Sequence, residues 1–407
     1  MGGADLLANQ RVEARAACLR GALTPRVGRA WPPLVWGGTG IAARECERTC
    51  QAHPSLRRSR MPSTPQQAPG KGAGVGAGIP SHFANPWGLL GRILRTRDGD
   101  AYYALWTALA SLGLSPLDRL LEGRELELYR SAPSGSRPPL FVCGPPRSGT
   151  TLAFQTLVRA FDVSYPTNLV AMFPRAPIAA TRRLSRPFRN ASIEPRSYYG
   201  RTHHWYGTSD ALHLWDRWLD PDRRKITRRI GGEAADAMRA FFRAWDAAFD
   251  RPLVMKNNSL NTSAALVAAE LPGSVFVMLQ REPFFLAQAL LRARSAIHGD
   301  PQAVYGVDDP DRPRSGDPLE DVALQVAFHQ HQAQIQQAAT PDDRLLILDY
   351  EHLCADPLEW VRAIGERMGW GGPLREPAPQ RPSLAVRLET AKTERLRAAL
   401  KAAGVAL

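Results

Sequence analysis

Two glycines and the residues around them form the segment of this sequence best suited to chemistry. The apolar run at residues 139–143 predicts a buried strand, Thr150 begins a predicted helix, and Gly144 and Gly149 lie in the loop between them. A glycine-rich loop between a strand and a helix N-terminus presents backbone N–H groups to an anion. The sequence therefore predicts a phosphate-binding loop, in which Arg147 supplies a cation.

This loop differs at one position from the common nucleotide-triphosphate loop, G-x-x-x-x-G-K-[ST]. In that loop the lysine reaches the terminal phosphates and the hydroxyl beside it holds Mg²⁺. Here Thr150 stands in the place of the lysine and Thr151 follows it. The geometry for a phosphate is kept, but the cation that contacts a magnesium-bound γ-phosphate is absent. This argues against the leading alternative, a P-loop kinase-like phosphotransferase, which also needs an aspartate at the end of an apolar strand.

Two other predicted strands end in a cation. Residues 274–280 lead into Arg281, and residues 251–256 end in Lys256. Ligands of open α/β sheets bind beyond the carboxyl ends of the strands, so both cations are expected beside the loop. The planar guanidinium of Arg281 suits two parallel bonds to phosphate oxygens. The ammonium of Lys256 is a compact charge that could neutralise a leaving oxygen.

Together these motifs resemble the sulfotransferases that use 3′-phosphoadenylyl sulfate (PAPS), in particular a bacterial branch of the carbohydrate and tyrosylprotein type. The resemblance covers roughly residues 138–370 through four ordered motifs: P-R-S-G-T-T-L at 146–152, K-N-N at 256–258, R-E-P at 281–283 and Y-E-H-L-C-A-D-P at 350–357. It implies PAPS as co-substrate and no metal. Arg281 would bind the 3′-phosphate and Lys256 would stabilise the leaving oxygen. The residues implied to hold the 5′-phosphosulfate are Arg147, Ser148, Gly149, Thr150 and Thr151.

One position departs from the family pattern. The family has a serine eight residues after the strand-end arginine, as a second ligand of the 3′-phosphate, and this chain has Ala289 there. The neighbouring Gln288 would point about 100° away around a helix. Either Arg292 substitutes for the serine, or the affinity for the co-substrate is low, or the co-substrate differs.

The general base has several candidates. The acceptor hydroxyl must lose its proton as it attacks sulfur. Some family members use a glutamate about twenty residues past the loop arginine, but this chain has Asn168 there, which cannot accept a proton. Asp210 falls where related sequences have an acidic residue. Catalytic roles are therefore expected for Arg147, Lys256 and Asp210 or His213, with the pair His203-His204 as a further alternative.

The alternation of strands and helices after residue 138 predicts an α/β fold: a P-loop-like parallel sheet flanked by helices. The expected elements are strands at 139–143, 251–256, 274–280 and 344–349 and helices at 149–160, 261–270, 283–296 and 356–368. Residues 166–251 are expected to form a helical, substrate-facing insert. Its aromatic residues are Phe173, Tyr198, Tyr199, Trp205, Tyr206, Trp215 and Trp218.

Three regions are expected along the chain. Residues 1–80 are predicted to be a disordered basic extension and linker, residues 81–135 a helical segment packed on the main domain, and residues 136–407 the sulfotransferase-like domain. Of the net charge of +13, a surplus of seven lies in residues 1–80, where Met61 is a possible alternative start. The cysteines there, including Cys46 and Cys50 near His53, lack a fourth metal ligand, so neither a zinc site nor a disulfide framework is expected.

The sequence therefore predicts a PAPS-dependent sulfotransferase that acts on the hydroxyl of a carbohydrate, a lipid or a small metabolite. Besides the kinase, the alternative is a catalytically silent nucleotide- or nucleic-acid-binding protein, which the net charge favours. No stretch reaches eighteen consecutive apolar residues, so no membrane span is expected. No nucleic-acid partner is expected either. The location is expected to be cytoplasmic, because arginines interrupt each apolar stretch near the N-terminus.

Overall fold

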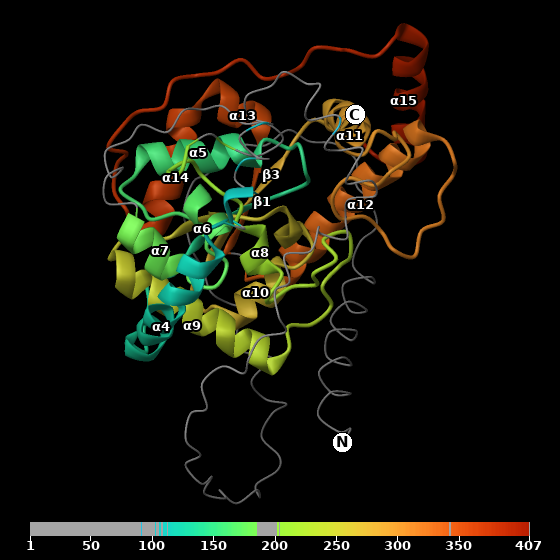
Figure 1. Cartoon of the computed structure of the whole chain (residues 1–407). Coiled ribbons are helices and arrows are strands. Elements are labelled where there is room, and N and C mark those ends of the chain that lie inside the picture. Colours follow the sequence, from blue (N-terminus) through green and yellow to red (C-terminus); the bar gives the residue numbers. More distant parts are fainter. Residues whose placement is uncertain are drawn as a thin grey trace, which may run out of the picture. The chain divides into compact units, whose positions relative to one another are not determined.

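The structure, a computed structural model, describes residues 113–184, 204–341 and 343–406, together with Thr202 and six positions between residues 91 and 111 (Figure 1). The chain divides into two units, Met1–Gln66 and Gln67–Leu407, and every described residue lies in the second.

Several predictions from the sequence therefore lie outside the described residues. They concern the extension and linker at residues 1–80, most of the segment between residues 81 and 112, and the side chains of Tyr198, Tyr199 and His203. These statements therefore remain predictions from the sequence.

The sheet has four parallel strands in the order β2-β1-β3-β4. They are β1 (Leu140–Cys143), β2 (Val254–Lys256), β3 (Val275–Gln280) and β4 (Leu345–Asp349). Val142 pairs with Lys256 and Cys143 with Met278, both in parallel register. The predicted parallel sheet is confirmed, and β2 starts three residues later than the expected strand.

Helices flank this sheet, as predicted. In chain order they are α4 (Ser115–Ser131), α5 (Thr150–Ala160), α6 (Asn168–Met172), α7 (Pro177–Leu184), α8 (Leu212–Trp215), α9 (Gly232–Phe249), α10 (Ala264–Glu270), α11 (Pro283–Ala293), α12 (Pro318–Ala339), α13 (Tyr350–Ala355), α14 (Pro357–Met368) and α15 (Thr390–Ala402). A 3-10 turn, η3 (Asn258–Asn261), follows β2, and a π-helical turn, η4 (Arg294–His298), follows α11. No helix among the described residues is long and apolar enough to cross a bilayer.

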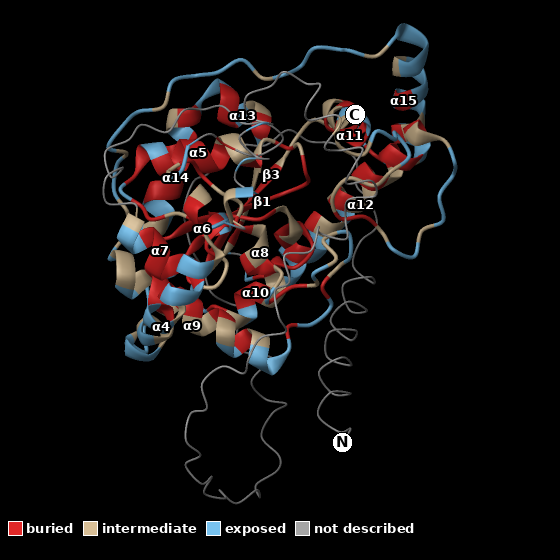
Figure 2. Cartoon of the chain, viewed as in Figure 1, coloured by how far each residue is buried: buried red, intermediate tan, exposed pale blue. Residues whose placement is uncertain are grey.

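Alternate residues of the strands pack into two hydrophobic cores, one on each face of the sheet. Phe141 and Phe276 pack with α8, α9 and α10 in a core that includes Trp215. Val142, on the opposite face of β1, packs with α5 and α14 in a core that includes Trp360. Figure 2 shows the buried residues along α5 and α14. Because both faces are covered, the strands are apolar throughout, which is why the sequence reveals them so clearly.

The sequence pattern does not predict α12 or α15. On α12 the buried residues include Asp321, Gln325, His329 and Gln336, so polar side chains lie on the face that packs inward. The helical period of apolar residues is therefore not visible in the sequence of α12. The expected helix at residues 283–296 also ends early, at α11, where the chain changes to the π-helical turn η4.

The insert between β1 and β2 is helical, with α6 to α9 in its described part. Three of its aromatic residues, Phe173, Trp215 and Trp218, are at most 4% exposed and belong to the hydrophobic cores. The expectation that these side chains face a substrate is therefore wrong, because they pack the interior. Trp205, which is 38% exposed, is the clearest surface aromatic among the described residues of the insert.

Two buried acids of α4 attach this helix to the N-terminus of α7. Asp118 accepts hydrogen bonds from the backbone N–H groups of Arg175 and Ala176. Glu125 accepts from those of Ile178 and Ala179, at 3.3 and 2.7 Å. The first turn of a helix has no intrahelical acceptors for its N–H groups and carries a partial positive charge, so carboxylates are favourable there.

Glu125 should make the stability of the protein fall as the pH rises from 4.5 to about 7. Burial raises the pKa of this carboxyl from 4.5 to about 7, although the N–H groups of Ala179 and Ile178 oppose the shift. The unfolded chain loses its proton first, so between these values the folded state binds more protons. The contribution of Glu125 to the free energy of unfolding should decline by roughly 3 kcal/mol across this window.

Urea unfolding at a series of pH values measures this slope. The difference in unfolding free energy between wild type and Glu125→Gln should fall by this amount across the window, whereas the difference between wild type and Glu122→Gln, on an exposed side chain of the same helix, should stay constant. A slope unchanged in Glu125→Gln would contradict the assignment.

Candidate functional site

The predicted loop and the two predicted cations lie at the same edge of the sheet. β1 lies between β2 and β3, and all three run in parallel. The loop leaves the carboxyl end of β1, Lys256 is the last residue of β2, and Arg281 follows β3 directly. Segments far apart in the sequence therefore meet where α/β sheets bind their ligands.

Both glycines of the loop are needed for steric reasons. Gly144 and Gly149 have φ angles of 140° and 96°, which L-residues rarely adopt. A methyl group on Gly144 would lie 2.4 Å from the carbonyl oxygen of Leu279, and one on Gly149 would lie 2.2 Å from Cδ2 of Tyr350. The loop is thus folded closely against β3 on one side and α13 on the other.

The loop offers hydroxyl and N–H donors at the start of α5. Ser148 is buried, and its Oγ has no hydrogen-bond partner among the described residues. The Thr150 hydroxyl donates to Oδ1 of Asn258 at 3.0 Å, which connects α5 to the turn after β2. The first N–H groups of α5 have no intrahelical acceptor. A buried unpaired hydroxyl beside such N–H groups fits an oxyanion.

Lys256 and Asp210 form an ion pair at this edge. Nζ of Lys256 lies 2.5 Å from Oδ2 of Asp210, and the two side chains are 2% and 21% exposed. Asp210 comes from the insert, shortly before α8. The structure thus places this base candidate in contact with Lys256.

Arg281 connects the loop to a distant part of the chain. Its Nη1 donates to the carbonyl of Arg147 at 2.9 Å and its Nη2 to the carbonyl of Ser383 at 2.7 Å. Its Nε is buried without a hydrogen-bond partner among the described residues. Burial lowers the pKa of this guanidinium, and the neighbouring Tyr350 and Glu351 oppose the shift. A guanidinium nevertheless stays charged at neutral pH.

Tyr350 has a larger part in this site than its motif suggests. Its ring limits the space at Gly149, and the guanidinium carbon of Arg281 lies 4.9 Å from the ring centroid. Its hydroxyl accepts from the backbone N–H of Ser383 at 3.3 Å. The sequence motif corroborates the family, but only the folded chain reveals that this tyrosine supports the loop, the arginine and the C-terminal segment together.

Gln288, the neighbour of the expected serine position at Ala289, has a structural task. Gln288, 5% exposed, donates to the carbonyl of Ala385 and accepts from the N–H of Arg387, at 2.9 and 2.6 Å. It therefore fixes the backbone of the segment at residues 383–387, while Ala289 is half-buried and Arg292 exposed. The sequence gives no direct sign of this contact. The prolines near residue 380 indicate only that this segment is extended.

The other base candidates have different surroundings. Burial and the guanidinium groups of Arg217 and Arg223 lower the pKa of His213 to about 3, so this ring is neutral at ordinary pH. His213 as a whole is only half-buried, but its Nε2 has no solvent contact. Asn168 donates to the carbonyls of Thr202 and His204, which is a structural task.

Comparison with known proteins identifies the family. A family model described as "Sulfotransferase family" matches residues 138–371, which include the loop, Lys256, Arg281 and Tyr350. No curated protein matches the chain significantly. The branch within the family stays a prediction.

Solved structures of sulfotransferases align with the chain at low identity. Sulfotransferase STF9 from Mycobacterium avium is 14% identical with a TM-score of 0.42, over 77% of this chain and 80% of that chain. STF1 from Mycobacterium tuberculosis H37Rv is 16% identical with a TM-score of 0.41, over 76% and 85%. A sulfotransferase from Alicyclobacillus acidocaldarius is 13% identical with a TM-score of 0.33, over 66% and 93%. The assignment rests on the family model, whose match spans more than half of the sequence, and by that match the chain belongs to the sulfotransferase family.

Proposed function

We propose that the chain transfers the sulfuryl group of PAPS to the hydroxyl group of an acceptor. The observation that carries this proposal is the ion pair of the buried Lys256 with Asp210, at 2.5 Å. It lies at the edge of the sheet where the anion-binding loop follows β1. A cation and a carboxylate beside an anion loop are the groups needed to stabilise a leaving oxygen and to accept a proton.

The residues at this edge fit the anionic groups of PAPS. Two glycines without room for a side chain, the unpaired Ser148 hydroxyl and the N–H groups of the first turn of α5 suit a phosphosulfate. Arg147 and the hydroxyls of Thr150 and Thr151 complete this set. Arg281 has a buried, unpaired Nε and suits the 3′-phosphate. Its contacts with the carbonyls of Arg147 and Ser383 use two of the five N–H donors of the guanidinium, which leaves donors for the phosphate oxygens.

The chemistry then follows from two side chains. PAPS supplies an activated sulfur–oxygen bond to phosphate, which breaks as the acceptor oxygen bonds to sulfur. Asp210 accepts the proton of the attacking hydroxyl and later passes it to water. Lys256 donates a hydrogen bond to the leaving phosphate oxygen, because an ammonium has three donors and Asp210 needs only one of them. His213 is a poorer base, since its pKa is lowered to about 3.

A magnesium-dependent phosphotransfer fits these residues less well. The strands on either side of β1 end in Lys256 and Gln280, and neither can bind a metal ion as a carboxylate would. Asp349 does end an apolar strand, but that strand is β4, which does not neighbour β1. The sulfuryl group also carries less charge than a γ-phosphoryl group and needs no metal to bind.

The acceptor is proposed to be a hydroxyl-bearing carbohydrate, lipid or small metabolite. With Phe173, Trp215 and Trp218 in the cores, support for this class comes from the exposed Trp205 and the stacked rings of His204 and Tyr206, 5.1 Å apart. Such rings bind the apolar faces of sugars and lipids.

Arg281→Ala should weaken the binding of adenosine 3′,5′-bisphosphate (PAP) by about tenfold to a hundredfold. The variant removes a charge-assisted contact with the 3′-phosphate, a contribution of about 1.5–3 kcal/mol. Isothermal titration calorimetry of PAP measures the change, with ATP and Mg²⁺ as the competing ligand.

Arg137→Ala is the matched control. Arg137 also makes two polar contacts, with Asp246 and Asp250, but it precedes the amino end of β1, at the opposite edge of the sheet. The control changes the net charge equally and should leave PAP affinity unchanged. If wild-type protein bound Mg²⁺-ATP tightly and PAP not at all, the phosphotransferase alternative would replace the proposed function.

A further inference from the structure

The loop between η4 and α12 contacts two parts of the candidate site. A methyl group on Gly306 would lie 2.4 Å from Cγ of Pro146, so this loop touches the phosphate-binding loop at a glycine. Two residues later, the backbone N–H of Asp308 donates to the carbonyl of Arg224 in the insert, at 3.3 Å. The loop therefore lies against both the predicted donor site and the insert that carries Asp210.

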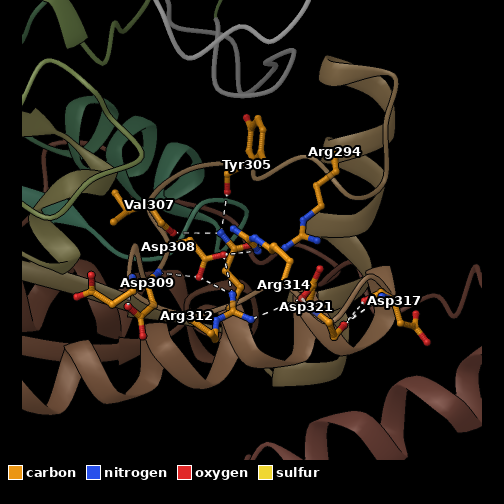
Figure 3. A network of polar contacts seen from close by, with 12 residues as sticks. Arg294, Tyr305, Val307, Asp308, Asp309, Arg312, Arg314, Asp317 and Asp321 are labelled. Carbon is orange, nitrogen blue, oxygen red and sulfur yellow. Dashed lines mark hydrogen bonds and ion pairs between the residues drawn. The ribbon is translucent and has the colours of Figure 1, made fainter.

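Buried side chains hold this loop on each side of Gly306. Gln325 of α12 is 0% exposed, and its Nε2 donates to the carbonyls of Tyr305 and Val307 at 3.0 and 3.1 Å. Arg294 of η4, also 0% exposed, donates from Nη2 to Oε1 of Gln325 at 2.8 Å. Figure 3 shows the carbonyl of Tyr305 directed at this polar network. One amide thus fixes the two peptide carbonyls that flank the glycine.

Ion pairs hold the second half of the loop. The carboxylate of Asp308, 4% exposed, lies 2.8 Å from Arg312 and 3.0 Å from Arg314. Arg312 also lies 3.8 Å from Asp321, a buried residue of α12 that accepts from the N–H of Ser315 at 3.0 Å. Figure 3 shows these charges gathered between the loop and α12. Breaking a buried ion pair destabilises a protein far more than breaking an exposed one. These contacts therefore hold the loop in place, although it has no regular secondary structure.

We propose that this loop positions the phosphate-binding loop, with Gly306, Gln325 and Arg294 as positioning residues for the sulfuryl donor. The inference rests on the proposed function and adds residues outside its motifs. Pro146 precedes Arg147, which has a φ of 73° and whose carbonyl accepts from Arg281. A displacement of Pro146 therefore moves the N–H groups of the loop and the carbonyl that orients Arg281.

An atom added at Gly306 must displace the phosphate-binding loop. The peptides around Gly306 are fixed by Gln325 and Arg294, so a new side chain at this position pushes against the ring of Pro146. Hydrogen bonds weaken steeply when their donors are misaligned, so a displaced loop should bind an anion less tightly.

Gly306→Ala tests the proposal, with Gly316→Ala as its control. The two glycines lie in the same loop and have nearly equal φ angles, 82° and 85°, but nothing lies within 4 Å of a methyl group on Gly316. Backbone strain is therefore common to both variants, and only Gly306→Ala displaces Pro146. Calorimetry should show PAP binding about tenfold to a hundredfold weaker in Gly306→Ala than in Gly316→Ala, because misplaced donors lose charge-assisted hydrogen bonds to the anion.

Pro146→Ala should restore the affinity of Gly306→Ala, at least in part. Cγ and Cδ of the proline are absent in the double variant, and the nearest remaining atom, Cβ, lies 3.5 Å from the added methyl group. Rescue is a readout that a general loss of stability would not give. Failure of the rescue, with Pro146→Ala itself binding PAP, would overturn the steric argument.

Hydrogen exchange without ligand separates this inference from the proposed function. Amides in a peptide covering residues 144–152 should exchange faster in Gly306→Ala than in Gly316→Ala, whether or not the protein binds PAP. If wild-type protein fails to bind PAP, the proposed function is wrong, and the exchange result alone decides on the positioning loop. If PAP binds equally to both glycine variants, the positioning role is wrong and the proposed function stands.

Discussion

Replacing Lys256 with methionine should lower kcat by about a hundredfold to a thousandfold and leave the KM for PAPS nearly unchanged. The leaving oxygen gains its charge only as the sulfur–oxygen bond breaks, so the lysine acts mainly on the transition state. The ammonium is 2% exposed, so its interaction with the developing charge on the leaving oxygen is screened little by water. Methionine has a similar length and no charge, so it can fill the same space. Turnover is measured as conversion of PAPS to PAP, with water or a simple phenol as acceptor.

Lys225→Met is the matched control for this substitution. The Lys225 side chain is 59% exposed and lies 3.8 Å from Asp222, so the same charge is lost from a hydrated surface pair. Its kcat should equal that of the wild type. If Lys256→Met raised the KM for PAPS as much as it lowered kcat, Lys256 would be a ligand of bound PAPS and not a group that acts on the developing charge of the leaving oxygen.

Local sequence was enough to predict the sheet and the ends of its strands. β1 and β3 are almost wholly apolar because both faces of the sheet are covered, and each is followed by residues of a different character. The loop after β1, Lys256 and Arg281 are therefore visible as interruptions of apolar runs. Parallel pairing then requires that these interruptions lie side by side.

Contacts between distant segments could not be predicted in the same way. Tyr350 packs on Gly149, Gln288 holds the backbone of Ala385, and Gly306 touches Pro146. No sequence pattern marks any of these pairs. A glycine in a loop, in particular, is interpreted first as a turn residue. The close approach that makes Gly306 necessary depends on the fold, and the fold there depends on buried polar residues of α12.

The choice among the base candidates also needed the structure. From the sequence, Asp210 and His213 lie on the same short segment and either could serve. In the folded chain Asp210 bonds to Lys256, whereas His213 has two guanidinium groups as neighbours and a lowered pKa. Cations lie beside both side chains, but a cation pairs with the carboxylate of Asp210 and repels the protonated form of His213.

Asp210→Asn should lower kcat by about a hundredfold to ten-thousandfold, with PAP affinity little changed. Asparagine keeps an oxygen that can accept the hydrogen bond of Lys256, but it cannot take a proton from the acceptor. The variant therefore separates a base from a residue that only holds the lysine. The rate of PAPS conversion and the affinity for PAP are measured for wild type and variant under the same conditions.

Asp216→Asn is the control, because Asp216 lies in the same insert, is 28% exposed and pairs with one cation, Arg223, at 2.6 Å. Urea unfolding of both variants checks that the fold is intact, since a buried lysine beside a neutral partner is costly. A wild-type rate in Asp210→Asn would assign this aspartate to the orientation of Lys256, and the proton would then have to leave through another group.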